Sequence, residues 1–185
     1  MIWSWSRKKW RMKALHSVLL TSTLAISSFA QDAKTNAVPD QSKTNQSVIT
    51  LLASAAEVSA PMVFTNGYLA QPERTELPAG GKAVFSFAAT NAGDYLIKVL
   101  VDGEGEDSNS FYVNVDAQPE DPMMIWDFDV TSGYQERTVS WRGNGTPESN
   151  EIVPKKFKLT VGAHKLIIIG REPAGLKTIS ICPVE

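Results

Sequence analysis

The stretch FKLTVGAHKLIII, residues 157–169, decides the fold class. Its first five residues alternate apolar and polar side chains, the period of two that marks a β-strand with one buried face. Gly162-Ala163 then supplies a turn. The continuous apolar run Leu166–Ile169 predicts a second strand that is covered on both faces. Two strands separated by a short turn are therefore expected here.

The same alternation recurs through the chain. It marks further strands at Ala83–Phe87, Tyr95–Val101, Phe111–Val115 and Leu176–Cys182. The Gly-containing turn Thr90–Asp94 predicts that the first two of these form a hairpin. No segment after residue 46 shows a sustained helical period. Short strands with turn residues between them, at a spacing of about ten residues, predict an all-β sandwich.

A shorter alternating segment, Trp126–Val130, carries two carboxylates. The period predicts that Trp126, Phe128 and Val130 face inward, so that Asp127 and Asp129 face outward. Two carboxylates on one strand face resemble the acid pair of a glycosidase. The more economical interpretation is an ordinary strand with a solvated polar face and Trp126 in the core.

The N-terminus has the pattern of a signal peptide. Five basic residues precede an uncharged stretch, Ala14–Phe29, and Ser28-Phe29-Ala30 resembles a cleavage site before Gln31. The uncharged stretch is shorter than the roughly 20 apolar residues that a membrane span needs. We therefore expect a signal peptide over 1–30, a flexible polar leader over 31–46, and a β-sandwich domain over 47–185. The expected location is secreted or periplasmic, with no membrane insertion after cleavage.

Removal of the predicted signal peptide, residues 1–30, makes the remaining chain acidic. The chain has 18 Lys and Arg against 20 Asp and Glu, and residues 1–30 hold five of the bases and none of the acids. The remaining 13 bases and 20 acids give a formal charge of −7. Such a surface repels phosphate backbones, so nucleic acid is not an expected partner.

Few reactive side chains remain beyond the predicted signal peptide. His164 and Cys182 are the only histidine and cysteine beyond residue 30, which excludes nearly every zinc site. The acidic stretch Asp102–Asp107 lacks the Gly and Glu that an EF-hand requires at residues 107 and 113. No nucleophile elbow or phosphate loop is present. We therefore expect no enzymatic activity and no cofactor.

Several segments, weak alone but in a consistent order, carry a family resemblance. They are Ala56-Glu57-Val58 with Pro61-Met62, Gly67-Tyr68 to Pro72, Gly80 to Ala83, Gly93-Asp94-Tyr95, Ser108 to Val113, Gly162 to Leu166, and Arg171 to Leu176. Together they resemble the carbohydrate-binding modules related to families 6 and 35. The resemblance covers about residues 55–181 and implies a galactose-binding-like jelly roll.

The resemblance also implies a structural calcium site, and the chain departs from it. Glu57 occupies one family calcium position, but Lys177 stands where an Asp is expected after the Arg171–Leu176 segment. An ammonium cannot ligate calcium, which takes oxygen donors. We predict that Lys177 instead pairs with Glu57 and replaces the ion, so that structural calcium is disfavoured and added calcium does not raise the melting temperature above that of an EDTA control.

The aromatic residues of the family's sugar site are also altered. Lys98 replaces a frequent Trp, and Tyr134-Gln135-Glu136 stands in for a Trp-x-Trp pair. Sugar rings bind to flat aromatic faces with a few polar groups around them. The predicted site has Tyr134 and Trp141 as stacking surfaces, with Glu136, Arg142 and Asn144 as hydrogen-bonding groups. Trp141 fits a core position equally well.

Two functions are compatible with these observations. The first is a non-catalytic, carbohydrate-binding-module-like domain that binds a glycan or polysaccharide through loop aromatics and polar groups. The alternative is a structural or protein-interaction sandwich of the cell envelope that has lost sugar binding, with an envelope protein as its partner.

Overall fold

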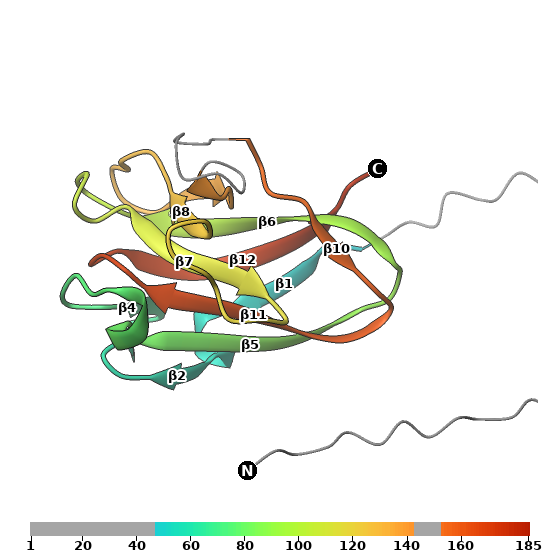
Figure 1. The fold of residues 1–185 in the computed structure, drawn as a ribbon, viewed down its shortest axis with the longest axis horizontal. Coiled ribbons are helices and arrows are strands. Elements are labelled where there is room, and N and C mark those ends of the chain that lie inside the picture. Colours follow the sequence, from blue (N-terminus) through green and yellow to red (C-terminus); the bar gives the residue numbers. More distant parts are fainter. Residues whose placement is uncertain (1–46, 143–152) are drawn as a thin grey trace, which may run out of the picture. The chain divides into compact units, whose positions relative to one another are not determined.

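The computed structural model describes residues 47–142 and 153–185, all within the compact unit Lys43–Glu185. The predicted signal peptide and polar leader, and Asn144, lie outside the described residues. Two antiparallel sheets form the fold (Figure 1). The structure describes two complete 3₁₀ turns, η1 (Ala53–Ala55) and η2 (Leu77–Ala79), and Arg142 also has 3₁₀ conformation. No described helix is long and apolar enough to cross a membrane.

The seven-stranded sheet has β6 and β12 at its centre. Its order is β10 (Phe157–Leu159), β6 (Gly93–Asp102), β12 (Gly175–Pro183), β4 (Tyr68–Ala70) and β3 (Val63–Thr65), with β9 (Gln135–Thr138) also paired to β6 and β1 (Ile49–Leu52) to β12. The five-stranded sheet runs β2 (Glu57–Ser59), β5 (Lys82–Ala89), β11 (Gly162–Gly170), β7 (Ser110–Val115) and β8 (Ile125–Asp127). The all-β sandwich expected from the alternation is confirmed.

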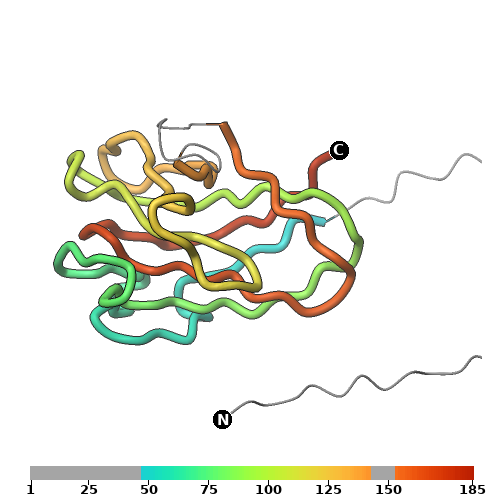
Figure 2. Tube along the Cα trace, in the orientation of Figure 1, coloured from blue at the N-terminus to red at the C-terminus, as the bar shows by residue number. Residues whose placement is uncertain are grey.

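The predicted hairpin of the two strands around Thr90–Asp94 is wrong. β5 pairs with β2 and β11, whereas β6 pairs with β9, β10 and β12 of the other sheet. The connection of residues 90–92 crosses from one sheet to the other, and the link from β10 to β11 does the same around the same end of the sandwich (Figure 2). Packed sheets lie only about 10 Å apart, so a short turn spans them as readily as it joins neighbours within a sheet.

The core lies between the two sheets and is built by the predicted alternation. Tyr95, Ile97, Val99 and Val101 of β6 are all buried, and the side chains between them are partly exposed. β11 is covered on both faces as predicted, because Leu166 and Ile168 join this core while Ile167 and Ile169 pack in a second apolar cluster with Tyr112 and Ile125.

Two expected core residues lie outside it. Trp126 and Phe128 are buried as predicted, but Val130 is 45% exposed because β8 ends at Asp127 and the alternation no longer applies beyond it. Val161 is 65% exposed for the same reason, since β10 ends at Leu159. The period of two predicts facing only within the hydrogen-bonded part of a strand.

Candidate functional site

A hollow of about 390 Å³ lies at one end of the seven-stranded sheet, and we call it the tyrosine pocket. Its main side chains are Tyr68, Tyr134, Asp102, Glu104 and Ser108, and residues 173–175 complete the wall. The two tyrosine rings lie 5.9 Å apart, centre to centre, and are tilted by 55°. Both rings are half-buried, so each presents part of its surface to the hollow.

The strands explain why these side chains meet. Leu69 of β4 is buried in the core, which turns its neighbour Tyr68 to the outer face of the sheet. Asp102 is the last residue of β6, and Gly175 is the first of β12. A Cβ atom at residue 175 would lie 2.7 Å from Tyr134 Oη, so glycine at this residue leaves the room that the Tyr134 hydroxyl occupies.

Burial, Asp102 and Lys177 determine the electrostatics of Tyr134. Burial, with smaller contributions from Tyr68 and Asp102, raises the pKa of Tyr134 to about 12, so this side chain remains a neutral phenol at physiological pH. Lys177 of β12 places its Nζ 3.7 Å from the centre of the Tyr134 ring. An ammonium at this distance is attracted to the negative face of the aromatic system.

The predicted ion pair between Lys177 and Glu57 is therefore wrong. Lys177 lies on the Tyr134 ring, while Glu57 is exposed on β2 in the other sheet and forms no ion pair with any described residue. In the part of the chain that the structure describes, no three Asp, Glu, His or Cys side chains gather closely enough to hold a metal ion. The two positions belong to different sheets.

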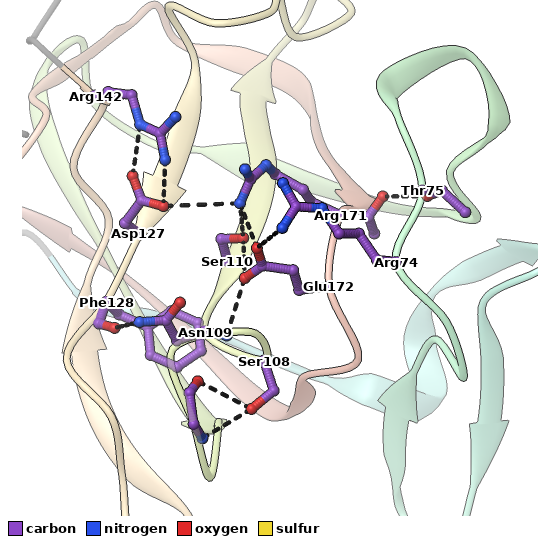
Figure 3. A network of polar contacts seen from close by, with 12 residues as sticks. Arg74, Thr75, Ser108, Asn109, Ser110, Asp127, Phe128, Arg142, Arg171 and Glu172 are labelled. Atoms are coloured by element: carbon purple, nitrogen blue, oxygen red, sulfur yellow. Dashed lines mark hydrogen bonds and ion pairs between the residues drawn. The ribbon is translucent and has the colours of Figure 1, made fainter.

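A second, larger hollow of about 680 Å³, the edge groove, lies along the open side of the sandwich between the segments of β8 and β9. Trp126 to Val130 line one side, and Arg137, Thr138, Ser140 and Arg142 line the other. Arg142 donates two hydrogen bonds to the Asp127 carboxylate, at 2.8 and 2.9 Å, and so bridges the two sides (Figure 3). These bonds raise the pKa of Arg142, which stays cationic.

A buried carboxylate holds the loops behind both hollows. The Glu172 side chain is only 3% exposed, and Oε1 lies 2.6 Å from Nη1 of Arg171 and 3.3 Å from Nη1 of Arg74. Its other oxygen accepts hydrogen bonds from Ser110 Oγ at 2.6 Å and from the Asn109 backbone N–H at 3.2 Å. Figure 3 shows these groups converging on the carboxylate. Glu172 thus links the 171–175 loop to the start of β7.

The predicted site residues do not come together in one place. Tyr134 lines the tyrosine pocket and Arg142 lines the edge groove. Glu136 is exposed on β9 and pairs with Lys98 on β6, with an N–O distance of 3.0 Å. The Glu136 contact also raises the pKa of Lys98. Of the predicted hydrogen-bonding groups, only Arg142 therefore lines a hollow among the described residues.

The sequence left two roles open for Trp141, a sugar-stacking surface and a core position, and the structure places it against the core. It is partly buried and packs against the main core, with its ring edge-on to Phe157 at a centre distance of 5.8 Å. Its Nε1 donates to the Val113 carbonyl at 2.9 Å, and Lys155 Nζ lies 4.0 Å from the ring centre. Trp141 lines neither hollow, so it is not a stacking surface of the candidate site.

Four aromatic or polar residues of the tyrosine pocket were not predicted. Tyr68 lay in a segment quoted for the family resemblance, which was the one signal that could have identified it. Asp102 and Glu104 belong to the acidic stretch that lacks the EF-hand residues, and Ser108 follows it. Nothing in their spacing indicates that they lie opposite Tyr134, because this proximity is created by the pairing of β6 with β9.

His164 has a structural role on the five-stranded sheet. It is buried, and its Nδ1 lies 2.6 Å from Asp116 Oδ2 while its Nε2 lies 2.8 Å from the Thr160 carbonyl. Burial alone would lower the pKa of His164, but these two acceptors outweigh it and raise the pKa. The same contact, with a bond from the Lys165 backbone N–H, outweighs burial at Asp116 and lowers its pKa. Because both ring nitrogens of His164 lie against oxygen acceptors, this geometry favours the protonated imidazolium beside the Asp116 carboxylate.

We expect the stabilising contribution of this pair to disappear at alkaline pH. The folded pKa of His164 lies above the unfolded value of about 6.5, so the contribution is complete below that pH and is lost as the pH rises through the folded pKa. The difference in unfolding free energy between wild type and His164→Phe, on the order of 1 kcal/mol in mild acid, should shrink as the pH rises above about 6.5. Chemical denaturation at each pH measures it; a constant difference would contradict a charged pair.

Known structures share this fold. No protein-family model matches the sequence, and no curated protein sequence matches it. A family 35 carbohydrate-binding module from Clostridium thermocellum is similar over 75% of this chain and 99% of its own, with 11% identity and a TM-score of 0.54. The family 35 module of Cellvibrio japonicus Abf62 is similar over 75% and 95%, with 11% identity and a TM-score of 0.52.

A catalytic protein contains the same fold as a part. The isomalto-dextranase of Arthrobacter globiformis T6, solved with panose, matches 72% of this chain but only 23% of its own length, with 11% identity and a TM-score of 0.53. At these identities the likeness concerns the fold alone. The β-sandwich of a carbohydrate-binding module, which the resemblance predicted, is confirmed.

Proposed function

We propose that this domain is a non-catalytic module that binds a glycan in the tyrosine pocket. The observation that carries the proposal is the pair of half-buried tyrosine rings, 5.9 Å apart, around a hollow that also contains carboxylate and hydroxyl groups. Its volume of about 390 Å³ is within the range of small-molecule sites. The likeness to solved carbohydrate-binding modules supports the same function.

The groups of the pocket match the surface of a sugar. The apolar side of a pyranose ring packs against an aromatic face, here that of Tyr68 or Tyr134. Its hydroxyl groups donate to carboxylates, here Asp102 and Glu104, and exchange hydrogen bonds with the Ser108 hydroxyl. These contacts bind and orient a sugar. The proposal is therefore recognition without catalysis.

Removal of either tyrosine ring tests the proposal. We expect Tyr134→Ala and Tyr68→Ala each to weaken glycan binding by about tenfold or more, because each removes an aromatic surface from the pocket. Binding is measured by affinity electrophoresis against a panel of soluble polysaccharides, followed by titration calorimetry. Glu136→Ala is the matched control, since Glu136 is exposed on β9 outside the pocket and its loss should leave affinity unchanged.

The opposite result would favour the alternative function. Wild-type affinity in both tyrosine variants, or no binding across the panel, would reject the pocket and leave a protein-interaction role. One observation favours that role: Val58 on β2 and Val63 and Phe64 on β3 are exposed large apolar side chains on edge strands. Apolar side chains on strand edges are typical contact points for another protein.

The proposal includes export. The basic, apolar and small-residue order of residues 1–30 supports a signal peptide and a secreted or periplasmic location, where polysaccharides are found. An envelope polysaccharide or an envelope protein is then the expected partner. The acidic composition of residues 31–185 supports the exclusion of nucleic acid.

A further inference from the structure

The tyrosine pocket carries an excess of negative charge. Two of its lining side chains, Asp102 and Glu104, are carboxylates, and none of its lining side chains is basic. Within residues 47–142 and 153–185, neither carboxylate forms an ion pair. Asp102 Oδ1 accepts one hydrogen bond, from Thr131 Oγ1 at 3.3 Å, which orients the carboxylate. The second oxygen of Asp102 is available to a ligand.

A cation beside the pocket, Lys177, lies on an aromatic ring. The Lys177 ammonium is 3.7 Å from the centre of the Tyr134 ring, and Lys177 does not line the hollow. This contact shows that Tyr134 presents an aromatic face suited to an ammonium group. It also compensates one of the two negative charges, so the pocket with Lys177 retains a net charge of about −1.

The rest of the protein reinforces this negative charge. Glu106 and Asp107 follow Glu104 in the same loop, and residues 31–185 together carry 20 acids against 13 bases. The summed field of such a surface raises the local concentration of cations and repels anions. The negative charge would therefore repel a glycan with carboxylate or sulfate groups. It would attract a glycan with protonated amines.

We propose that the tyrosine pocket selects a glycan of amino sugars whose amines are not acetylated. This inference rests on the proposed function. A protonated amine on the sugar ring supplies three hydrogen-bond donors and a positive charge, which match the Asp102 and Glu104 carboxylates. The apolar side of the same sugar ring packs against Tyr68 or Tyr134. The pocket thus pairs an aromatic surface with a site for an ammonium group.

Three ligands that differ in one substituent test the selection. Tetrasaccharides of β-1,4-linked glucosamine, N-acetylglucosamine and glucose share a backbone and carry an amine, an acetamide or a hydroxyl at the same carbon. In calorimetric titrations at a pH where the amine is protonated, we expect the glucosamine tetramer to bind at least about tenfold more tightly than the other two. This advantage should fall as salt is added, because exposed charge pairs are screened.

Variants assign the selection to the two carboxylates. Asp102→Asn and Glu104→Gln keep the shape of each side chain and remove its charge, and together they should bring the affinity for glucosamine within about twofold of that for glucose. Affinity for the uncharged tetramers should fall by less than affinity for glucosamine, because their hydroxyl groups still find the amide carbonyl oxygens of both variants as acceptors. The matched control, Glu136→Gln, removes a carboxylate of the same sheet that does not line the pocket and should preserve the preference.

Each result separates this inference from the proposed function. Equal affinity for the three tetramers, or a preference that survives in the double variant, overturns the selection for amines. If an uncharged polysaccharide binds in a Tyr134-dependent way and the glucosamine tetramer does not, the selection fails and the glycan site stands. Absence of every glycan interaction in the panel rejects both.

Discussion

Replacing Glu172 with alanine should lower the free energy of unfolding by about 3–5 kcal/mol. The Glu172 carboxylate is 3% exposed and receives bonds from Arg171, Ser110 and the Asn109 backbone. Its removal leaves the Arg171 guanidinium, itself only 12% exposed, without this partner. An uncompensated buried charge costs more than the intact pair contributes, which is why truncation of one partner is so disruptive. The Asp127 carboxylate cannot replace the lost bond, because its Oδ1 lies 4.0 Å from Arg171 Nη1, too far for a hydrogen bond.

Urea denaturation followed by circular dichroism measures this effect. Glu172→Gln should cost less than the alanine variant, because the amide keeps its carbonyl acceptor and the packing of the side chain. Arg74→Ala is the control, since Arg74 contacts the same Glu172 oxygen but is 52% exposed, and exposed pairs contribute about 0–1 kcal/mol. A loss in Glu172→Ala no larger than that in Arg74→Ala would show that the network does not hold the loops.

Trp126→Ala should have an effect of similar size, about 3–5 kcal/mol, through a different mechanism. Trp126 is fully buried, and its ring centre lies 5.2 Å from that of Phe128 and 6.2 Å from that of Phe111. Alanine at this position leaves a cavity beneath the edge groove and removes an aromatic neighbour from both phenylalanines.

Thermal and urea unfolding of Trp126→Ala, compared with Trp126→Phe, separate the two parts of this effect. The phenylalanine variant keeps an aromatic ring and most of the volume, so it should lose less stability than the alanine variant. The fluorescence of Trp141 remains as a probe of folding in both variants. A loss below about 1 kcal/mol in Trp126→Ala would mean that this ring is not part of the packed core.

The fold was largely predictable because strand alternation is a local property. The runs around β5, β6, β7, β11 and β12 were identified from the period of two, and the double coverage of β11 followed from its unbroken apolar residues. Pairing was not predictable in the same way. The Thr90–Asp94 turn looked like the loop of a hairpin, yet β5 and β6 lie in different sheets because turns of this length serve both connections.

The candidate site was likewise predictable only in part. Tyr134 was identified from the sequence and lines the tyrosine pocket, whereas Glu136 and Trp141 do not. Glu136 is two residues along from Tyr134 but lies on β9 beside Lys98. Trp141 was equally compatible with stacking and core packing, and the bond from its Nε1 to the Val113 carbonyl places it against the core.

The sequence by itself determined that this protein is an all-β sandwich with net negative charge over residues 31–185, because alternation and composition are local properties of the chain. Only the tertiary structure decided which distant side chains meet. The pairing of β6 with β9 and β12 brings Tyr134 to Tyr68, Asp102 and Lys177. The physical reason is that a binding site depends on register and sheet order, which are set by long-range pairing and not by neighbours in the chain.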